Sequence, residues 1–378
     1  MMDFSFSDDE KTVAELARKI LSEKVTPERL KDFELSEAAI DTEVWQALAD
    51  SSLLGVAISE EHGGMDLGFL ALSLLCQEVG RTVAPVPVFA SLVLGGMPLA
   101  RFGSDSEQAE WLPKVAKGET ILTAALTELE SSDPLLPRTR AEKSVEGFKL
   151  YGQKSLVPAG AQASRILIPA MTDEGSLILA WVEPGMQGLR IEEQSASDRQ
   201  AYALIELDGV AVTNADLLGG LEGGEARLSW LVDCSTAALC SIQLGVIERA
   251  LEMTSEYGNE RVQFDRPIGS FQAFHQRAAD AYIMVESLRL CTQEAIWLIS
   301  KEKSALDSAT VAKYWAAEGA QFTAFACQHL HGGIGIDVDY PLHRYFIWAT
   351  QLEHALGSAP HQLDKLGLRI AQSGMPDF

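Results

Sequence analysis

The spacing of hydrophobic residues divides the chain into three stretches. Across residues 7–102, apolar side chains recur every three or four positions, which is the period of amphipathic helices. Ser7 and the acidic residues that follow it up to Glu10 predict a capped helix start with an acidic first turn. The paired glycines Gly63 and Gly64 predict a turn between two helices. The first stretch is therefore expected to be helical throughout.

The pattern changes near residue 120 and changes back near residue 225. Between these points, short apolar runs alternate with Gly, Pro, Asp and Ser, as in a β domain. Helical spacing then continues to about Leu366. We therefore predict an α+β chain with a helical domain at residues 1–120, a β domain at 121–222 and a second helical domain at 223–378.

Composition narrows the classes of protein that fit. With 378 residues, 47% of them hydrophobic, the chain can bury substantial cores. A formal net charge of −24 argues against nucleic acid as a general partner, because the protein repels phosphate backbones. The five scattered cysteines suit buried thiols in a reducing compartment. We find no apolar run long enough to cross a bilayer and no secretory pattern at the start, so we expect a cytoplasmic protein without membrane insertion.

Several separated segments carry motifs that together resemble one family. The match covers nearly the whole chain and keeps the order of the family, the acyl-CoA dehydrogenases. The segments are residues 54–65 (Leu-Gly-Val-Ala-Ile-Ser-Glu-Glu-His-Gly-Gly-Met), 125–128 (Ala-Leu-Thr-Glu) with Ser132 and Asp133, 150–154 (Leu-Tyr-Gly-Gln-Lys), 261–264 (Arg-Val-Gln-Phe) with 267–269 (Pro-Ile-Gly), Phe271 and Gln272, 331–335 (His-Gly-Gly-Ile-Gly) and 339–341 (Asp-Tyr-Pro).

This resemblance implies a fold and an activity. The fold has an N-terminal helical domain, a middle β-barrel-like domain and a C-terminal four-helix bundle. The activity is dehydrogenation of an acyl-CoA between its α and β carbons, with FAD shared across a subunit interface and an electron-transfer acceptor as a further partner.

The resemblance also assigns cofactor-binding positions. In the family, the segments matched by Arg261 and by Gly332 and Gly333 serve the adenine and pyrophosphate half of a neighbour's FAD, and the flavin half lies near the positions of Thr127 and Ser132. Arginine offers a permanent bidentate cation, and glycine allows close backbone approach. The same motifs add Phe264, Phe271, Gln272 and His329, the last standing where a glutamine is usual.

Each of these residues also has an ordinary structural role open to it. Arg261 could be a surface ion-pair residue, and Gly332 with Gly333 a helix-ending turn. Their joint occurrence in family order favours the cofactor role. For Thr127 and Ser132, capping of local backbone groups stays an equal alternative.

The catalytic base is missing where the family keeps it. The reaction requires a carboxylate that takes the α proton. Counting along the motifs places Leu356 at the commoner base position and Ser235 at the alternative one, and neither can act as the base. Two neighbouring carboxylates are alternative candidates, and Glu353 is the better of them. Glu353 lies three residues before Leu356 and is expected on roughly the same helix face, and Asp233 lies two residues before Ser235. The Trp-Ile-Thr that packs on the flavin in the family is replaced here by residues 156–158 (Leu-Val-Pro), which makes a flavin pocket in this subunit doubtful.

Three functional hypotheses remain. The first is a non-catalytic paralogue in a heteromeric acyl-CoA dehydrogenase of the type that degrades sterol side chains, a heterotetramer in which the partner carries the base. The second is a self-sufficient homotetramer that uses Glu353. The third is an inert scaffold or regulatory relative. We expect no metal site, because a helical path separates His329 from Cys327 and His331.

Overall fold

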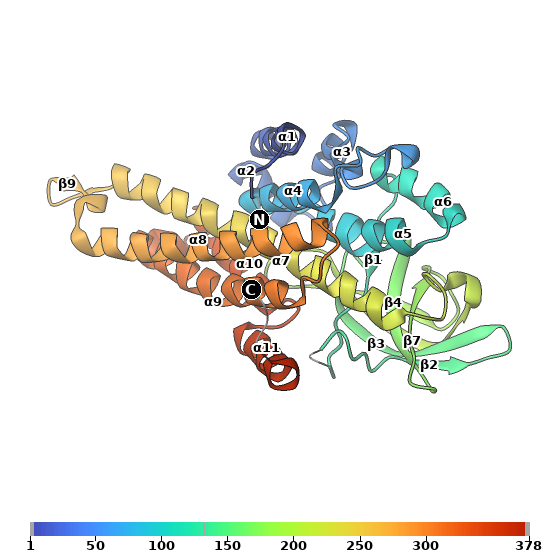
Figure 1. The fold of residues 1–378 in the computed structure, drawn as a ribbon. Helices are drawn as coiled ribbons and strands as arrows, with labels where there is room; N and C mark the ends of the chain where they lie inside the picture. Colours follow the sequence, from blue (N-terminus) through green and yellow to red (C-terminus); the bar gives the residue numbers. More distant parts are fainter. Residues whose placement is uncertain (1–3, 132, 375–378) are drawn as a thin grey trace. The chain divides into compact units, whose positions relative to one another are not determined.

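A computed structural model describes residues 4–131 and 133–374 (Figure 1). These residues form two compact units. Unit 1 comprises Met1–Lys31, Ser73–Ala84 and Thr236–Phe378, and unit 2 comprises Asp32–Leu72 and Pro85–Ser235. The fold class predicted from the sequence is confirmed as α+β, whereas the domain limits at residues 120 and 222 stay predictions.

The chain up to residue 116 is helical, as predicted. Ser7 forms the expected capping box, because its side chain accepts from the Glu10 N–H while the Glu10 carboxylate accepts from the Ser7 N–H. The elements are α1 (Asp8–Lys24), α2 (Pro27–Leu35), α3 (Thr42–Asp50), η1 (Leu53–Gly55), η2 (Glu60–His62), α4 (Gly68–Thr82), the π-helical η3 (Phe89–Gly96), α5 (Met97–Phe102) and α6 (Asp105–Ala116).

The predicted turn at the paired glycines follows η2. Gly63 has a positive φ of 81°, which glycine adopts without strain. A Cβ on Gly64 would lie 2.1 Å from the carbonyl oxygen of Ile58, so only glycine fits there. The turn is therefore required by close backbone packing within unit 2.

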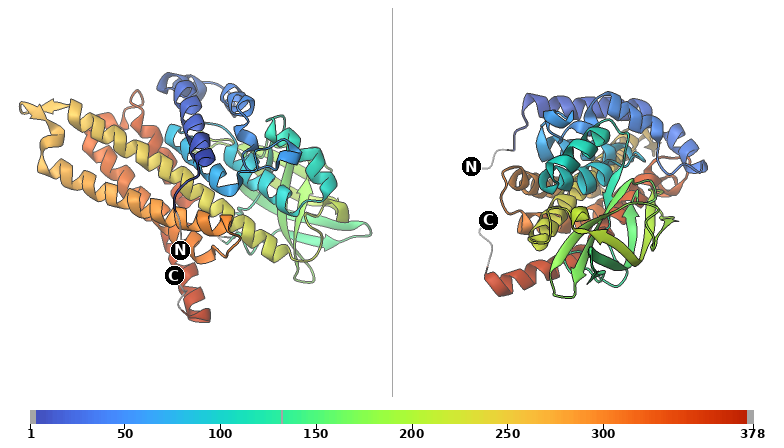
Figure 2. Two further views of the ribbon diagram at one scale, coloured as in Figure 1. Left: turned by 45° about the horizontal axis from the view of Figure 1, so that its top comes forward. Right: turned by 90° about the vertical axis from the view of Figure 1, so that its right-hand side faces the viewer.

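The β domain of unit 2 is one curled sheet, which can be followed in Figure 2. The strand order is β1-β4-β2-β3-β7-β6, and β5 pairs with β4. Strand β1 is parallel to β4, and the long strands β3 and β7 form an antiparallel pair. The strands are β1 (Leu122–Ala124), β2 (Arg140–Lys143), β3 (Gly147–Pro158), β4 (Arg165–Thr172), β5 (Leu177–Val182), β6 (Leu189–Gln194) and β7 (Tyr202–Thr213), followed by η4 (Asn214–Asp216).

Most of unit 1 is a bundle of long helices. Helices α8, α10 and α11 all pack on α9, and a short hairpin of β8 and β9 joins the end of α7 to α8 (Figure 1). The elements are α7 (Gly224–Glu260), β8 (Val262–Gln263), β9 (Arg266–Pro267), η5 (Ile268–Ser270), α8 (Gln272–Ser300), α9 (Leu306–His331), η6 (Gly332–Ile336), α10 (Leu342–His354) and α11 (Ala359–Ser373).

Helix α7 is long and apolar enough to cross a membrane by length and composition. The sequence-based expectation concerns uninterrupted apolar runs, and Asp233 and Glu248 interrupt this helix. Within the most apolar window of α7, 89% of the residues are buried, and burial inside the protein accounts for this composition.

Candidate functional site

The first group of candidate residues lies where α7 ends. Arg261 follows the helix directly, and its exposed side chain makes no hydrogen bond or ion pair with any other residue that the structure describes. The hairpin beyond it turns through Phe264 and Asp265, whose φ angles are 54° and 63°. Positive φ at both loop residues is typical of a type I′ turn and is strained for a bulky side chain. Phe264 is nevertheless 87% exposed.

Aromatic and polar groups surround this hairpin. The ring of Phe271 contacts that of Phe264 edge-on, with a centroid separation of 6.1 Å, and the Arg266 guanidinium lies 4.0 Å from the Phe271 ring centroid. Gln272 begins α8 and is exposed. An exposed ring, an exposed amide and an unpaired guanidinium therefore lie together beside the end of α7.

The second group lies where α9 ends. Gly332 follows the last helical residue with a φ of 64° and a ψ of −141°, and both Gly332 and Gly333 have open space where a Cβ would point. His329, in the last turn, is exposed, whereas Cys327 and His331 are buried. The backbone of the turn is thus bare and accessible.

These two groups fit the pyrophosphate and adenine half of a dinucleotide. Arg261 would supply a cation for phosphate, and Phe264 offers an exposed ring. The glycine turn would let a ligand approach the backbone closely, although the Gly332 N–H itself donates to the His329 carbonyl oxygen. Arg261, Phe264, Phe271, Gln272, His329, Gly332 and Gly333 all belong to unit 1.

The candidate residues of unit 2 fit a flavin less well. The side chain of Thr127 is exposed, and its carbonyl oxygen accepts from the Ser155 N–H at 3.0 Å. Ser132 lies outside the described residues. Strand β3 has a bulge between Lys154 and Val157, and there the Leu156 N–H donates to the Gln194 side-chain oxygen at 2.7 Å.

The segment that follows Lys154 therefore has few groups left to offer a ligand. The N–H of Leu156 is already satisfied by Gln194, Pro158 has no N–H, and the aromatic platform is replaced by leucine.

A buried ion pair holds this part of unit 2. The Lys154 ammonium donates to the Glu128 carboxylate at 2.7 Å, and the side chains are 0% and 4% exposed. Burial alone would raise the pKa of Glu128, but Lys154 and hydrogen bonds from Thr139 and Arg138 lower it overall. Burial lowers the pKa of Lys154 to about 8. Both groups are therefore charged at pH 7 and tie the Thr127 segment to strand β3.

Neither residue that the motifs place at a base position of the family is a carboxylate. Ser235 is 0% exposed, and its hydroxyl donates to the Leu231 carbonyl oxygen at 2.6 Å, within α7. Leu356 has a φ of 54° and follows the end of α10. The Ser235 hydroxyl thus has a structural partner within its own helix, and Leu356 lies outside the helix.

Glu353 does not share a helix face with Leu356, so that expectation is wrong. Helix α10 ends at His354, and Ala355 is extended with a ψ of 127°. The last turn is capped by the buried Lys313, whose ammonium donates to the carbonyl oxygens of Leu352 at 3.0 Å and Glu353 at 2.9 Å. The chain therefore leaves the helical path before Leu356, and the Lys313 ammonium satisfies two carbonyl oxygens that the helix end leaves free.

The Glu353 carboxylate also has a partner of its own. It accepts from the Gln321 side-chain amide at 3.2 Å.

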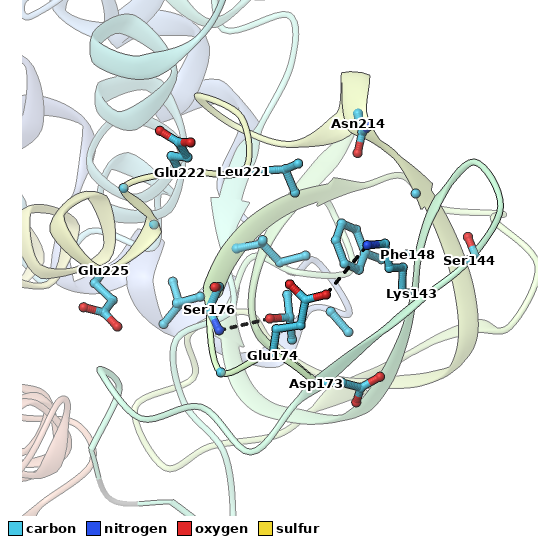
Figure 3. A pocket seen from close by; sticks show the side chains of 18 of the residues that line it. Lys143, Ser144, Phe148, Asp173, Glu174, Ser176, Asn214, Leu221, Glu222 and Glu225 are labelled. Carbon is cyan, nitrogen blue, oxygen red and sulfur yellow. Dashed lines mark hydrogen bonds and ion pairs between the residues drawn. The ribbon is translucent and has the colours of Figure 1, made fainter.

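A cavity of about 800 Å³ opens at one end of the sheet in unit 2. Phe148 and Ile178 are among the residues that line it. The Glu174 carboxylate also lines it and lies 3.7 Å from the Lys143 ammonium (Figure 3). Four further acids line it: Glu146, Asp173, Glu222 and Glu225. Since FAD and CoA both carry phosphate groups, this acidic lining argues against either ligand here.

Comparison with known proteins identifies the family. The models for the N-terminal and C-terminal domains of acyl-CoA dehydrogenase match residues 7–119 and 224–370. Acyl-CoA dehydrogenase FadE27 of Mycobacterium tuberculosis is 36% identical over 98% of this chain and 100% of its own length. The chain belongs to the acyl-CoA dehydrogenase family. This match confirms the resemblance that the motifs indicated. Members of the family are FAD-dependent oxidoreductases.

Two solved structures of acyl-CoA dehydrogenase complexes are similar over almost the whole chain. The ChsE4-ChsE5 complex from Mycobacterium tuberculosis superposes with a TM-score of 0.92 at 36% identity, covering 100% of both chains. A variant of the Tcur3481-Tcur3483 steroid ACAD gives a TM-score of 0.90 at 39% identity, covering 97% of this chain and 98% of the other. Structures named for a pair of chains are thus among the solved relatives.

Sequence reasoning missed two residues that shape the site. Gln194 stabilises the bulge at Leu156 from 38 positions away, and no local pattern marks that contact. Tyr257 stacks on His331 at a centroid distance of 4.6 Å. Its position one helical turn before Arg261 is the only signal that the sequence offers for it.

Proposed function

We propose that this chain is the non-catalytic subunit of a heteromeric acyl-CoA dehydrogenase of the cytoplasm. It completes the FAD site of a paralogous subunit, which carries the catalytic glutamate, in an α2β2 heterotetramer. The observation that carries the proposal is a contrast within the chain. Leu356 and Ser235 stand at the two positions that the motifs assign to the base, whereas Arg261, Gly332 and Gly333 are of the residue types that the far half of the cofactor needs.

The chemistry explains why such a chain needs a partner. Removing the α proton of a thioester requires a positioned base, and neither an aliphatic side chain nor a hydroxyl hydrogen-bonded within its own helix can accept it. FAD, when bound, supplies the acceptor for the hydride that leaves the β carbon. The residues of this chain would hold the pyrophosphate through Arg261 and the turn backbone, and would cover the adenine with Phe264.

The near relatives support a heteromer and suggest a substrate class. The ChsE4-ChsE5 relative is a complex of two named chains, and the Tcur3481-Tcur3483 relative is a steroid ACAD. We therefore propose a steroid-derived acyl-CoA as the substrate and an electron-transfer protein as the acceptor.

Glu353 gives little support to a self-sufficient enzyme. Its carboxylate accepts from Gln321, its carbonyl oxygen accepts from Lys313, and the helix that carries it ends at His354, before Leu356. A base must reach within contact distance of the substrate, and misplacement is heavily penalised.

Co-expression with a paralogue that carries the glutamate tests the proposal. The purified complex should hold about half a flavin per chain, since each shared site is completed once per heterodimer. It should also oxidise steroid-derived acyl-CoA thioesters. The chain expressed alone should do neither. A colourless complex, or a partner-free chain that oxidises an acyl-CoA with its own flavin, would overturn the proposal.

A further inference from the structure

Three aromatic side chains meet between the two groups of candidate cofactor residues in unit 1. The rings of Tyr257 and His331 are stacked, with centroids 4.6 Å apart and planes inclined by 16°. Tyr340 contacts both, at centroid distances of 6.4 Å from Tyr257 and 5.2 Å from His331. The three residues come from α7, from the end of α9 and from the segment before α10. We call them the aromatic clamp.

Hydrogen bonds fix the orientation of the imidazole in this clamp. Its Nδ1 lies 2.8 Å from the carbonyl oxygen of Cys327, and because a carbonyl only accepts, Nδ1 carries the proton. In the neutral ring, Nε2 then accepts from the Tyr340 hydroxyl at 3.1 Å. His331 is only 4% exposed, so the ring is held by a stack on one side and by hydrogen bonds at both nitrogens.

The clamp is linked through the backbone to both candidate groups. Gly332 follows His331 directly, and the turn folds back so closely that a Cβ on Gly335 would lie 2.9 Å from the Gln328 carbonyl oxygen. Arg261 lies one helical turn after Tyr257, and its N–H donates to the Tyr257 carbonyl oxygen at 2.9 Å. Movement of either ring would therefore move one group relative to the other.

We propose that the aromatic clamp of Tyr257, His331 and Tyr340 sets the spacing between Arg261 and the Gly332 turn that the pyrophosphate half of the shared FAD requires. The inference rests on the proposed function. The three are positioning residues, because they act through Arg261 and the turn backbone.

The clamp is needed because, within the part of the chain that the structure describes, neither Arg261 nor the Gly332 turn has side-chain contacts that would hold it in position. Arg261 has no side-chain partner among the described residues, and Gly332 and Gly333 have no neighbouring atoms within 4 Å of a would-be Cβ. Neither group is therefore held in place by its own side-chain contacts. Affinity falls in proportion to the fraction of molecules that hold the binding-ready arrangement, so the clamp acts by raising that fraction.

The test compares variants of the chain in complex with its glutamate-bearing paralogue. Titration of the flavin-free complex with FAD gives the dissociation constant. Tyr257→Leu should weaken binding by about tenfold, the factor for loss of a ring pair of up to about 1.5 kcal/mol. Tyr257→Phe keeps the ring that stacks on His331 and should bind FAD as tightly as the wild type. Hydrogen exchange at the amides of residues 332–335 should be faster in Tyr257→Leu than in Tyr257→Phe.

Two further variants keep the outcomes distinct. Phe346→Leu removes an edge-on ring contact with Phe325, 5.0 Å between centroids, elsewhere in unit 1, and should leave the affinity unchanged. Arg261→Ala tests the proposed function itself. If Arg261→Ala weakens flavin binding and Tyr257→Leu does not, the clamp is wrong and the shared site stands. If Arg261→Ala has no effect, the shared site is wrong.

Tyr340→Phe decides the matter if Tyr257→Leu does not fold. It removes only the hydroxyl that donates to His331, and a hydrogen bond is worth about 0.5–1.5 kcal/mol, or about two- to tenfold in affinity. Unchanged affinity in this variant would also overturn the clamp.

Discussion

Replacing Glu128 with glutamine should destabilise the protein strongly, although the side chain keeps its shape. The carboxylate accepts from the Lys154 ammonium at 2.7 Å, from the Thr139 hydroxyl at 2.6 Å and from the Thr139 N–H at 3.0 Å. It also accepts from the Arg138 N–H. Glutamine would turn one acceptor oxygen into a donor and leave the Lys154 ammonium, which is 0% exposed, without its counter-ion.

The size of the effect follows from burial. Removing one partner of a buried pair costs about 3–5 kcal/mol, because the remaining charge is desolvated and unpaired. Lys154 keeps one acceptor, the Pro169 carbonyl oxygen at 2.9 Å, and burial already lowers its pKa to about 8. Loss of the carboxylate lowers that pKa further, so the lysine can shed its proton and limit the penalty. We therefore expect about 3 kcal/mol, the lower end of the range.

Urea unfolding of the full-length chain, followed by circular dichroism, measures this loss. The control is Arg190→Ala, which removes two exposed ion pairs, to Glu206 at 3.3 Å and to Glu192, and should cost less than about 1 kcal/mol. The double variant of Glu128→Gln with Lys154→Met removes both charges and should recover part of the stability. If Glu128→Gln alone unfolds within about 1 kcal/mol of the wild type, the reasoning about the buried pair is refuted.

Three further predictions concern the remaining sites. Gly64→Ala should lower the free energy of unfolding by about 1–3 kcal/mol, because the new Cβ would lie 2.1 Å from a backbone oxygen. Gly367→Ala in α11, where no atom lies within 4 Å of the new Cβ, should raise it by about 0.5–1 kcal/mol. Equal effects of the two variants in urea unfolding would contradict this reasoning. Glu353→Gln should leave acyl-CoA turnover by the heteromeric complex unchanged in a dye-reduction assay, and a loss of two orders of magnitude would restore Glu353 as the base. Burial lowers the pKa of His331 more than its hydrogen bond to Cys327 raises it, so the folded state disfavours the protonated ring. The unfolded chain takes up this proton near pH 6.5, so the contribution of His331 to stability is fully present above that pH and is lost as the pH drops below it. In urea unfolding, the His331→Gln variant should lose less stability between pH 7 and pH 5 than the wild type. An equal loss would contradict the lowered pKa of His331.

The amino-acid sequence alone determined the fold class, and it predicts that the base is missing. Helical and strand periods are local properties, because a residue's neighbours at three, four or two positions decide which face it shares. The replacement of a carboxylate by Leu356 or Ser235 is a matter of side-chain identity, which no fold can alter. The motifs that resemble the family are contiguous, so they too could be read along the chain.

Only the tertiary structure decided how the retained groups are held. No local pattern in the sequence marks Gln194, yet its side chain accepts from the Leu156 N–H at the bulge. The ring of Tyr257 stacks on His331, the residue before the Gly332 turn, although Tyr257 lies 75 positions before Gly332 in the chain. Such contacts join residues far apart in sequence and leave no periodic trace in it. The end of α10 before Leu356 was also invisible, because the buried Lys313 that caps it comes from another helix. Helix ends depend on which side chains reach the free carbonyls, and that is settled by packing rather than by local propensity.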